Sequence, residues 1–151
     1  MSKAIQSNTQ AGDVPFVAGE DLTGCEGLLV KLATVGGKAA VALPDAQTDV
    51  IPFVVTEGDA SGALVTVRPL EAGRNVRLRI SGDCAAGDVL VLADPATPGA
   101  AGKVVVLPED AGSYRAVAVA EAAGVDGGTP LCRPVFAGVI VVEAAAPGGG
   151  A

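Results

Sequence analysis

Short apolar runs recur along the chain, and glycines, prolines and polar residues separate them. The runs are VPFVA, LLVKLA, AAVAL, VIPFVV, LVTVRPL, VRLRI, VLVL, KVVVL, RAVAVAEAA, LCRPV and GVIVV. Strand-length runs at this spacing, with turn residues between them, are typical of β-sandwiches and β-barrels. We therefore predict an all-β fold: a compact small barrel or sandwich, tulip-like in shape, of about ten short strands.

The segment Val76–Ser81 alternates between apolar and polar side chains. Its valine, leucine and isoleucine fall on one side, while Arg77 and Arg79 fall on the other. This alternation predicts a half-buried strand. Gly82 and Gly87 bound the loop that follows, which leads into the next apolar run, so the stretch reads as a strand, a loop and a second strand.

Glycine and proline mark the limits of other strands. Gly36 and Gly37 separate two strand-like runs, where a tight hairpin needs positive φ angles. Pro52 and Pro69 lie inside apolar runs and cannot donate a ladder hydrogen bond, so we expect their strands to be sheet edges or to bulge there. In Tyr114–Gly124, alternating valines favour a strand over the helix that alanine and glutamate favour.

The two ends of the chain lack the strand pattern. Residues 1–13 are polar and aperiodic, which predicts a flexible N-terminal arm, and residues 144–151 are predicted to form a disordered tail. Between them, residues 14–143 form the predicted β-rich domain. A chain of 151 residues suits one domain with a single core, filled by small aliphatic side chains because aromatic residues are few.

Composition narrows the functions that this domain can have. The chain has no histidine and its three cysteines are widely spaced, so we expect no metal site, no cofactor and no enzymatic activity. A net charge of −7 argues against a nucleic-acid partner, and no apolar run is long enough to span a membrane. The mean hydropathy of +0.49 has two explanations: apolar surface buried against other copies or a partner, or an alanine-rich composition.

Four of the ten basic residues lie close together in the sequence: Arg68, Arg74, Arg77 and Arg79. In an otherwise acidic chain, this cluster has two interpretations. It is either a solvated face balanced by neighbouring acids or a docking stripe for an acidic partner.

Four segments resemble the small capsid cement, or head decoration, proteins of tailed bacteriophages and prophages. They are AGEDLTGCEGLLVKL, DVIPFVVTEGDASGALVTVRPL, GDCAAGDVLVLAD and YRAVAVAEAAGVDGGTPLCRPV. The sequence departs from that family at Ala116 and Val117, where the family often has a glycine, and in Phe136–Ala151, which has no counterpart.

The resemblance implies a structural protein of the virion, made in the cytoplasm of the host bacterium. It implies that the chain binds the outer surface of the phage head as a homotrimer, contacts the major capsid protein and cements the capsid lattice. Contacts with the capsid or between subunits are then expected at the four arginines and at Lys3, Ile5, Val14 and Phe16. The resemblance also implies that Gly82 and Gly87 turn the chain so that the strand of Arg77 and Arg79 pairs with the next apolar run.

Two other functions remain open at this point. One is a surface-binding or carbohydrate-binding β module of a phage fibre or adhesin, although such modules present aromatic platforms and this chain has only three phenylalanines and one tyrosine. The other is a carboxylate-dependent hydrolase, for which the sequence offers many acids in loops and no convergent acid–base pair.

Overall fold

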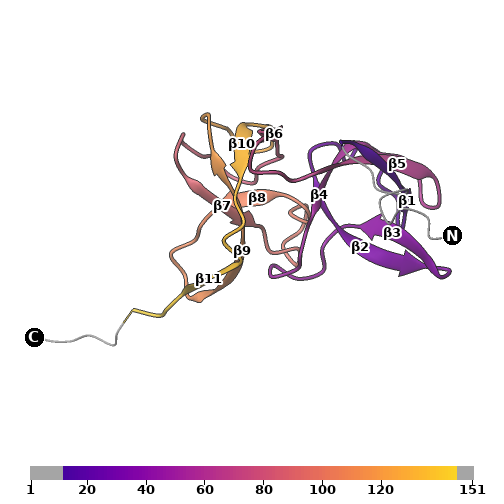
Figure 1. Cartoon of the computed structure of the whole chain (residues 1–151). Coiled ribbons are helices and arrows are strands. Elements are labelled where there is room, and N and C mark those ends of the chain that lie inside the picture. The colour runs from indigo at the N-terminus through magenta and orange to yellow at the C-terminus, as the bar shows by residue number, and fades with distance from the viewer. Residues whose placement is uncertain (1–11, 146–151) are drawn as a thin grey trace, which may run out of the picture.

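The computed structural model describes residues 12–145, which form eleven strands and no helix (Figure 1). The strands are β1 (Val14–Ala18), β2 (Leu29–Val35), β3 (Lys38–Ala42), β4 (Phe53–Glu57), β5 (Leu64–Pro69), β6 (Val76–Arg77), β7 (Val89–Leu92), β8 (Val104–Val106), β9 (Gly112–Ala120), β10 (Leu131–Pro134) and β11 (Val139–Val142). Each predicted apolar run contributes to one of them, so the all-β fold is confirmed.

The predicted ends of the chain fall mostly beyond this range. Of the arm at residues 1–13 only Gly12 and Asp13 are described, and of the tail at residues 144–151 only Ala144 and Ala145. The two predictions for these segments therefore lie outside the described residues. Within residues 12–145, no helix is long and apolar enough to cross a membrane.

The first five strands close into a barrel in the order β1-β3-β2-β4-β5. β1 runs parallel to β3 and antiparallel to β5, which completes the ring. The β2–β3 hairpin pairs Val35 with Lys38 across Gly36 and Gly37, whose φ angles are +56° and +76°. Both central residues of such a turn need positive φ, so the predicted hairpin is confirmed.

Pro52 and Pro69 do not lie on sheet edges, which corrects the prediction. β4 pairs with β2 and β5, and β5 pairs with β4 and β1, so the ring leaves neither strand an edge. Pro52 precedes β4 and Pro69 is the last residue of β5, while the irregularity between these strands lies at Val55 and Glu57. Strand ends accept proline because the missing N–H matters less there.

The remaining strands form a second sheet in the order β6-β10-β9-β7-β8, with β11 paired to the first half of β9. The expected pairing of the arginine strand with the next apolar run is wrong, because β10 and β9 lie between β6 and β7. β6 is also shorter than the alternating segment. Beyond β6, the N–H groups of Leu78, Arg79 and Ile80 donate to loop carbonyls, those of Pro130, Gly27 and Gly128, and the N–H of Ser81 donates to Val104 of β8.

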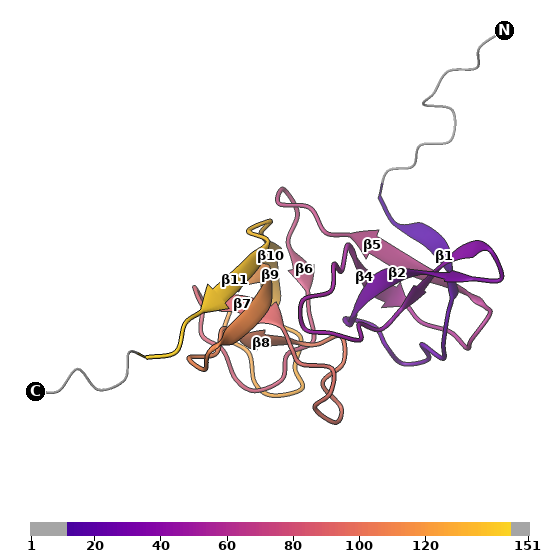
Figure 2. The same cartoon turned by 90° about the horizontal axis from the view of Figure 1, so that it is seen from below.

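Buried side chains gather in two clusters, whereas the chain length predicted one core. The first fills the barrel and includes Leu22 and Val67. The second cluster fills the other half, and it also includes three residues of the barrel half: Leu29, Ile51 and Val54. A closed ring of few strands has room only for its own inward side chains, so the outward ones build a separate layer. That layer holds the two halves side by side (Figures 1 and 2).

Candidate docking groove

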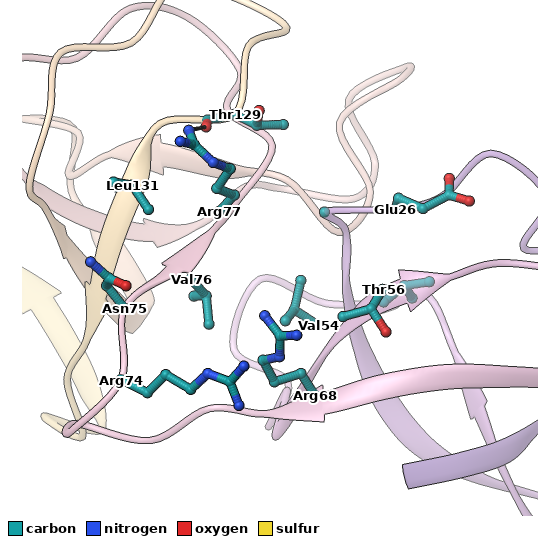
Figure 3. A pocket seen from close by; sticks show the side chains of 12 residues that line it. Glu26, Val54, Thr56, Arg68, Arg74, Asn75, Val76, Arg77, Thr129 and Leu131 are labelled. Atoms are coloured by element: carbon teal, nitrogen blue, oxygen red, sulfur yellow. Dashed lines mark hydrogen bonds between the residues drawn. The ribbon is translucent and has the colours of Figure 1, made fainter. Parts of the chain in front are cut away.

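A groove of about 520 Å³ lies between the barrel and the second sheet (Figure 3). β4 and β5 contribute one wall, and β6 with the start of β10 contributes the other. Three of the four arginines singled out in the sequence line the groove: Arg68, Arg74 and Arg77. The fold therefore gathers these side chains around one recess.

Arg68 is held in place by Asp13. It lies on β5, and its Nε and Nη2 donate to the two carboxylate oxygens of Asp13 at 2.8 and 3.0 Å. Val14 pairs with Val67, so the strand register brings the two charged residues together. The hydrogen bonds from Arg68 lower the pKa of Asp13 below its ordinary 3.8, and the charges of Arg68 and Arg74 act in the same direction.

Arg74 and Arg77 have guanidinium donors that are open to a ligand. The Arg74 side chain is exposed, and residues 12–145 offer it no hydrogen-bond or ion-pair partner. Figure 3 shows it reaching into the space beside Arg68. Arg77 is also exposed, and its Nη1 donates to the carbonyl oxygen of Thr129 at 3.1 Å. A guanidinium carries five N–H donors, so most of those on Arg77 remain free.

The floor of the groove is apolar. Val54 and Val76 are buried there, and Leu131 lies beside them. Glu26 is the one acidic residue among the lining residues, and Figure 3 shows its carboxylate turned away from the arginines. The groove is therefore a positive recess in a chain whose net charge is −7.

Arg79 does not line the groove, unlike the other three arginines. Its Nη2 donates to the carbonyl oxygens of Gly24 and Glu26 at 2.9 and 2.6 Å, and its own N–H donates to the carbonyl of Gly27. Arg79 follows the same alternation as Arg77, but its guanidinium is bound by carbonyls of the loop at residues 24–27. Its bonds stabilise the contact between the barrel and the second half.

The other predicted contact residues lie away from the groove or outside the described residues. Lys3 and Ile5 belong to the second group. Val14 is buried in the barrel, and the ring of Phe16 packs against Phe53 with centroids 5.2 Å apart. Val14 therefore belongs to the barrel core and Phe16 is half-buried against it, while their expected role as contact residues stays a prediction.

The loop between Gly82 and Gly87 is hydrogen-bonded to the loop that follows β9. Both glycines turn the chain, with φ angles of +81° and +93°. Cys84 and Gly124 exchange backbone hydrogen bonds of 3.0 Å in each direction, and the carboxylate of Asp126 accepts from the N–H of Gly82 at 2.7 Å. The loop is therefore architectural, but it joins two loops rather than two neighbouring strands.

Sequence reasoning missed the polar residues of the groove: Thr56, Asn75 and Thr129. No linear pattern links these positions, because they meet only when the second half packs beside the barrel. It also assigned Asp13 to the flexible arm. The one signal for the role of Asp13 was its place directly before the first predicted strand.

The cysteines sit apart from the groove and are all free thiols. Cys84 and Cys132 are buried in the second core, and Cys25 is half-buried. Burial raises the pKa of Cys132 to about 11, so this thiol stays uncharged at neutral pH. These surroundings suit core packing rather than nucleophilic chemistry.

Replacing Asp13 with asparagine tests the ion pair with Arg68. We expect a loss of stability below about 1 kcal/mol. The pair is weak because the side chains of Arg68 and Asp13 keep 28% and 32% of their surface exposed. Since folding depresses the pKa of Asp13, the contribution is present above the ordinary value of 3.8 and is lost as the pH falls through the lower folded value. Urea denaturation at neutral pH and at about pH 2 checks this, and an equal difference at both would contradict it.

The chemistry of the groove suits an extended segment that carries carboxylates. Guanidinium groups hold carboxylates through paired hydrogen bonds, as Arg68 does with Asp13. The apolar floor can pack against the aliphatic part of such a segment. No protein-family model matches this chain, and no curated protein matches it in sequence.

Proposed function

We propose that this chain is a structural protein of the virion that binds the outer surface of a tailed-phage head and cements the capsid lattice. The observation that carries the proposal is the arginine groove, a positive recess on an acidic molecule. Such a recess favours a partner that presents acidic side chains. The resemblance of four segments to head decoration proteins suggests that this partner is the major capsid protein.

Binding of this kind stabilises a shell without chemistry. A protein that binds the assembled lattice, and not the free subunits, shifts the equilibrium toward assembly by its binding free energy. A head offers many equivalent sites, so a modest affinity at each site is sufficient. The net charge of −7 keeps decorated particles apart in solution.

The aromatic side chains give no support to the carbohydrate-binding alternative. Phe16 and Phe53 pack against each other, and Tyr114 is buried with its hydroxyl donating to the carbonyl of Asp110 at 2.9 Å. Only Phe136 is largely exposed. A sugar platform needs ring faces that are open to solvent, and a single exposed ring does not form one.

Heads purified from a phage that lacks this gene test the proposal. We expect the purified protein to bind them saturably, in a fixed ratio to the major capsid protein, and to raise the temperature at which they release DNA. Absence of the protein from wild-type virions, together with no binding to the deficient heads, would contradict the proposal. The homotrimer implied by the resemblance stays a prediction, which sedimentation of the free and bound protein tests.

A further inference from the structure

The edge strand β11 leaves one side of its backbone open. It pairs with β9, and residues 12–145 hold no strand on its other side. By contrast, the barrel is a complete ring, and an isolated bridge between Ile80 and Val104 gives β8 a contact on its outer side. An open edge is a template for another strand.

β11 also lacks the features that usually protect an edge. Charged residues and prolines commonly guard exposed edges, and the sequence VIVV contains neither. Val139 and Val141 are 39% and 65% exposed. An apolar, unguarded edge of this kind is suited to being covered by a partner strand.

An apolar hollow of about 340 Å³ adjoins β11, and Phe136 and Val50 beside it are 73% and 66% exposed. Arg115, its one charged lining residue, already donates to the carbonyl of Thr48 at 2.8 Å. The net charge of the chain is −7 and the lining residues of this hollow include no acid, so two copies repel each other least where this largely apolar face meets its equivalent.

The hydrogen bonds to β9 fix which backbone groups of β11 face the open edge. The carbonyl of Gly138 accepts from the N–H of Ala116, and Ile140 pairs with Tyr114. Backbone groups alternate in direction along an antiparallel strand. Val139 and Val141 therefore direct their N–H and carbonyl groups away from β9.

We propose that β11 pairs with β11 of a second copy, antiparallel across a two-fold axis. In this register Ile140 of one copy lies opposite Ile140 of the other. Val139 of each copy then faces Val141 of the other, and these two Val139–Val141 pairs exchange about four hydrogen bonds. Continued beyond the strand, the same register places Ala144 of one copy opposite Phe136 of the other, next to the hollow. It also keeps the two Glu143 carboxylates apart, so no like charges face each other.

This pairing goes beyond the proposed function and does not depend on it. A two-fold contact produces a dimer, or a hexamer if the expected trimer also forms. Either mass differs from that of a monomer or a simple trimer. Sedimentation of the purified protein therefore separates the possibilities without any capsid.

A cysteine at the axis tests the register. Residues directly opposite in a non-hydrogen-bonded antiparallel pair have Cα atoms about 4.5 Å apart, within the range of a disulfide. In a Cys25→Ser background, Ile140→Cys is expected to form an intermolecular disulfide on mild oxidation. Leu64→Cys is the control, since Leu64 lies on the barrel and is 66% exposed. Cross-linking of the control at an equal rate would overturn the proposal.

Two substitutions at Val141 test the edge itself. Val141→Pro removes an N–H that points to the open edge and leaves the bonds to β9, and Val141→Lys adds a guarding charge. We expect both variants to keep the circular dichroism of the wild type and to sediment at half its mass. A wild-type protein that sediments as a monomer or a simple trimer at every concentration would overturn the pairing, as would variants that sediment unchanged.

Discussion

Adding one methyl group at Gly58 is expected to destabilise the protein by about 3 kcal/mol, the upper end of the usual range for overpacking. A Cβ at this position would lie 1.9 Å from the carbonyl oxygen of Leu22, a backbone atom that cannot rotate away. Leu22 is fully buried in the barrel, and its N–H donates to the carbonyl of Asp59 at 2.9 Å. Thermal unfolding of Gly58→Ala should show a melting temperature lower by roughly 6 to 12 °C.

Two other glycines separate this clash from the general cost of losing a glycine. An added Cβ at Gly73 or Gly62 has no neighbour within 4 Å, and only Gly62 has a positive φ, of +83°. We expect Gly73→Ala to be nearly neutral and Gly62→Ala to cost about 1 kcal/mol through backbone strain. Equal stability of Gly58→Ala and Gly73→Ala would contradict this prediction. It would mean that the backbone at Leu22 can move away from Gly58, which follows the end of β4.

Strand positions could be predicted because each depends on a local pattern. The buried residues of Val76–Ser81 are its valine, leucine and isoleucine, as the alternation indicated. Gly36 and Gly37 were sufficient to predict both a turn and the antiparallel pairing across it, since a two-residue loop leaves the chain no other path.

Strand partners beyond a hairpin could not be predicted in this way. β6 pairs with residues 131–132 of β10 rather than with the strand that follows it. An alternating segment predicts that one face of the strand is buried, but it does not predict which neighbouring strand provides the hydrogen-bond partners. The same limit explains the second core, because Leu29 and Val54 look like barrel residues until the other half packs on them.

The positive charge of the candidate groove could be predicted from the sequence, but the residues that line the groove could not. Arg68, Arg74 and Arg77 stood out because they are concentrated in an acidic chain. Arg79 shares that signal, yet the loop of residues 24–27 captures its guanidinium. Only the fold distinguishes an arginine that faces a recess from one whose guanidinium donates to the carbonyls of a neighbouring loop.

Reversing the charges of Arg74 and Arg77 together is expected to weaken binding to undecorated heads by at least about 30-fold. Loss of one partner of a desolvated ion pair typically costs about 2 to 5 kcal/mol, and about 1.4 kcal/mol corresponds to a factor of ten. The double variant R74E/R77E leaves the Arg68–Asp13 pair and the bonds of Arg79 intact. Occupancy measured on heads over a range of protein concentrations gives the change in affinity.

A matched control separates the position of these charges from their number. The double variant K38E/K103E changes the net charge by the same amount, and neither lysine lines the groove. Lys38 begins β3 at the hairpin turn, and Lys103 precedes β8. We expect this control to bind heads nearly as well as the wild type. Circular dichroism and melting of both variants establish that each is folded.

Salt dependence gives a second measure of the same groove. The distance over which charges interact falls from about 10 Å at 0.1 M salt to about 3 Å at 1 M, so wild-type affinity for heads should fall as salt is added. R74E/R77E has lost the attraction that salt screens, and its residual binding should respond less. Occupancy equal to that of the wild type at every salt concentration would mean that Arg74 and Arg77 are a solvated face. An equal loss of binding in K38E/K103E would instead assign the effect to total charge, because the groove would then have no special role.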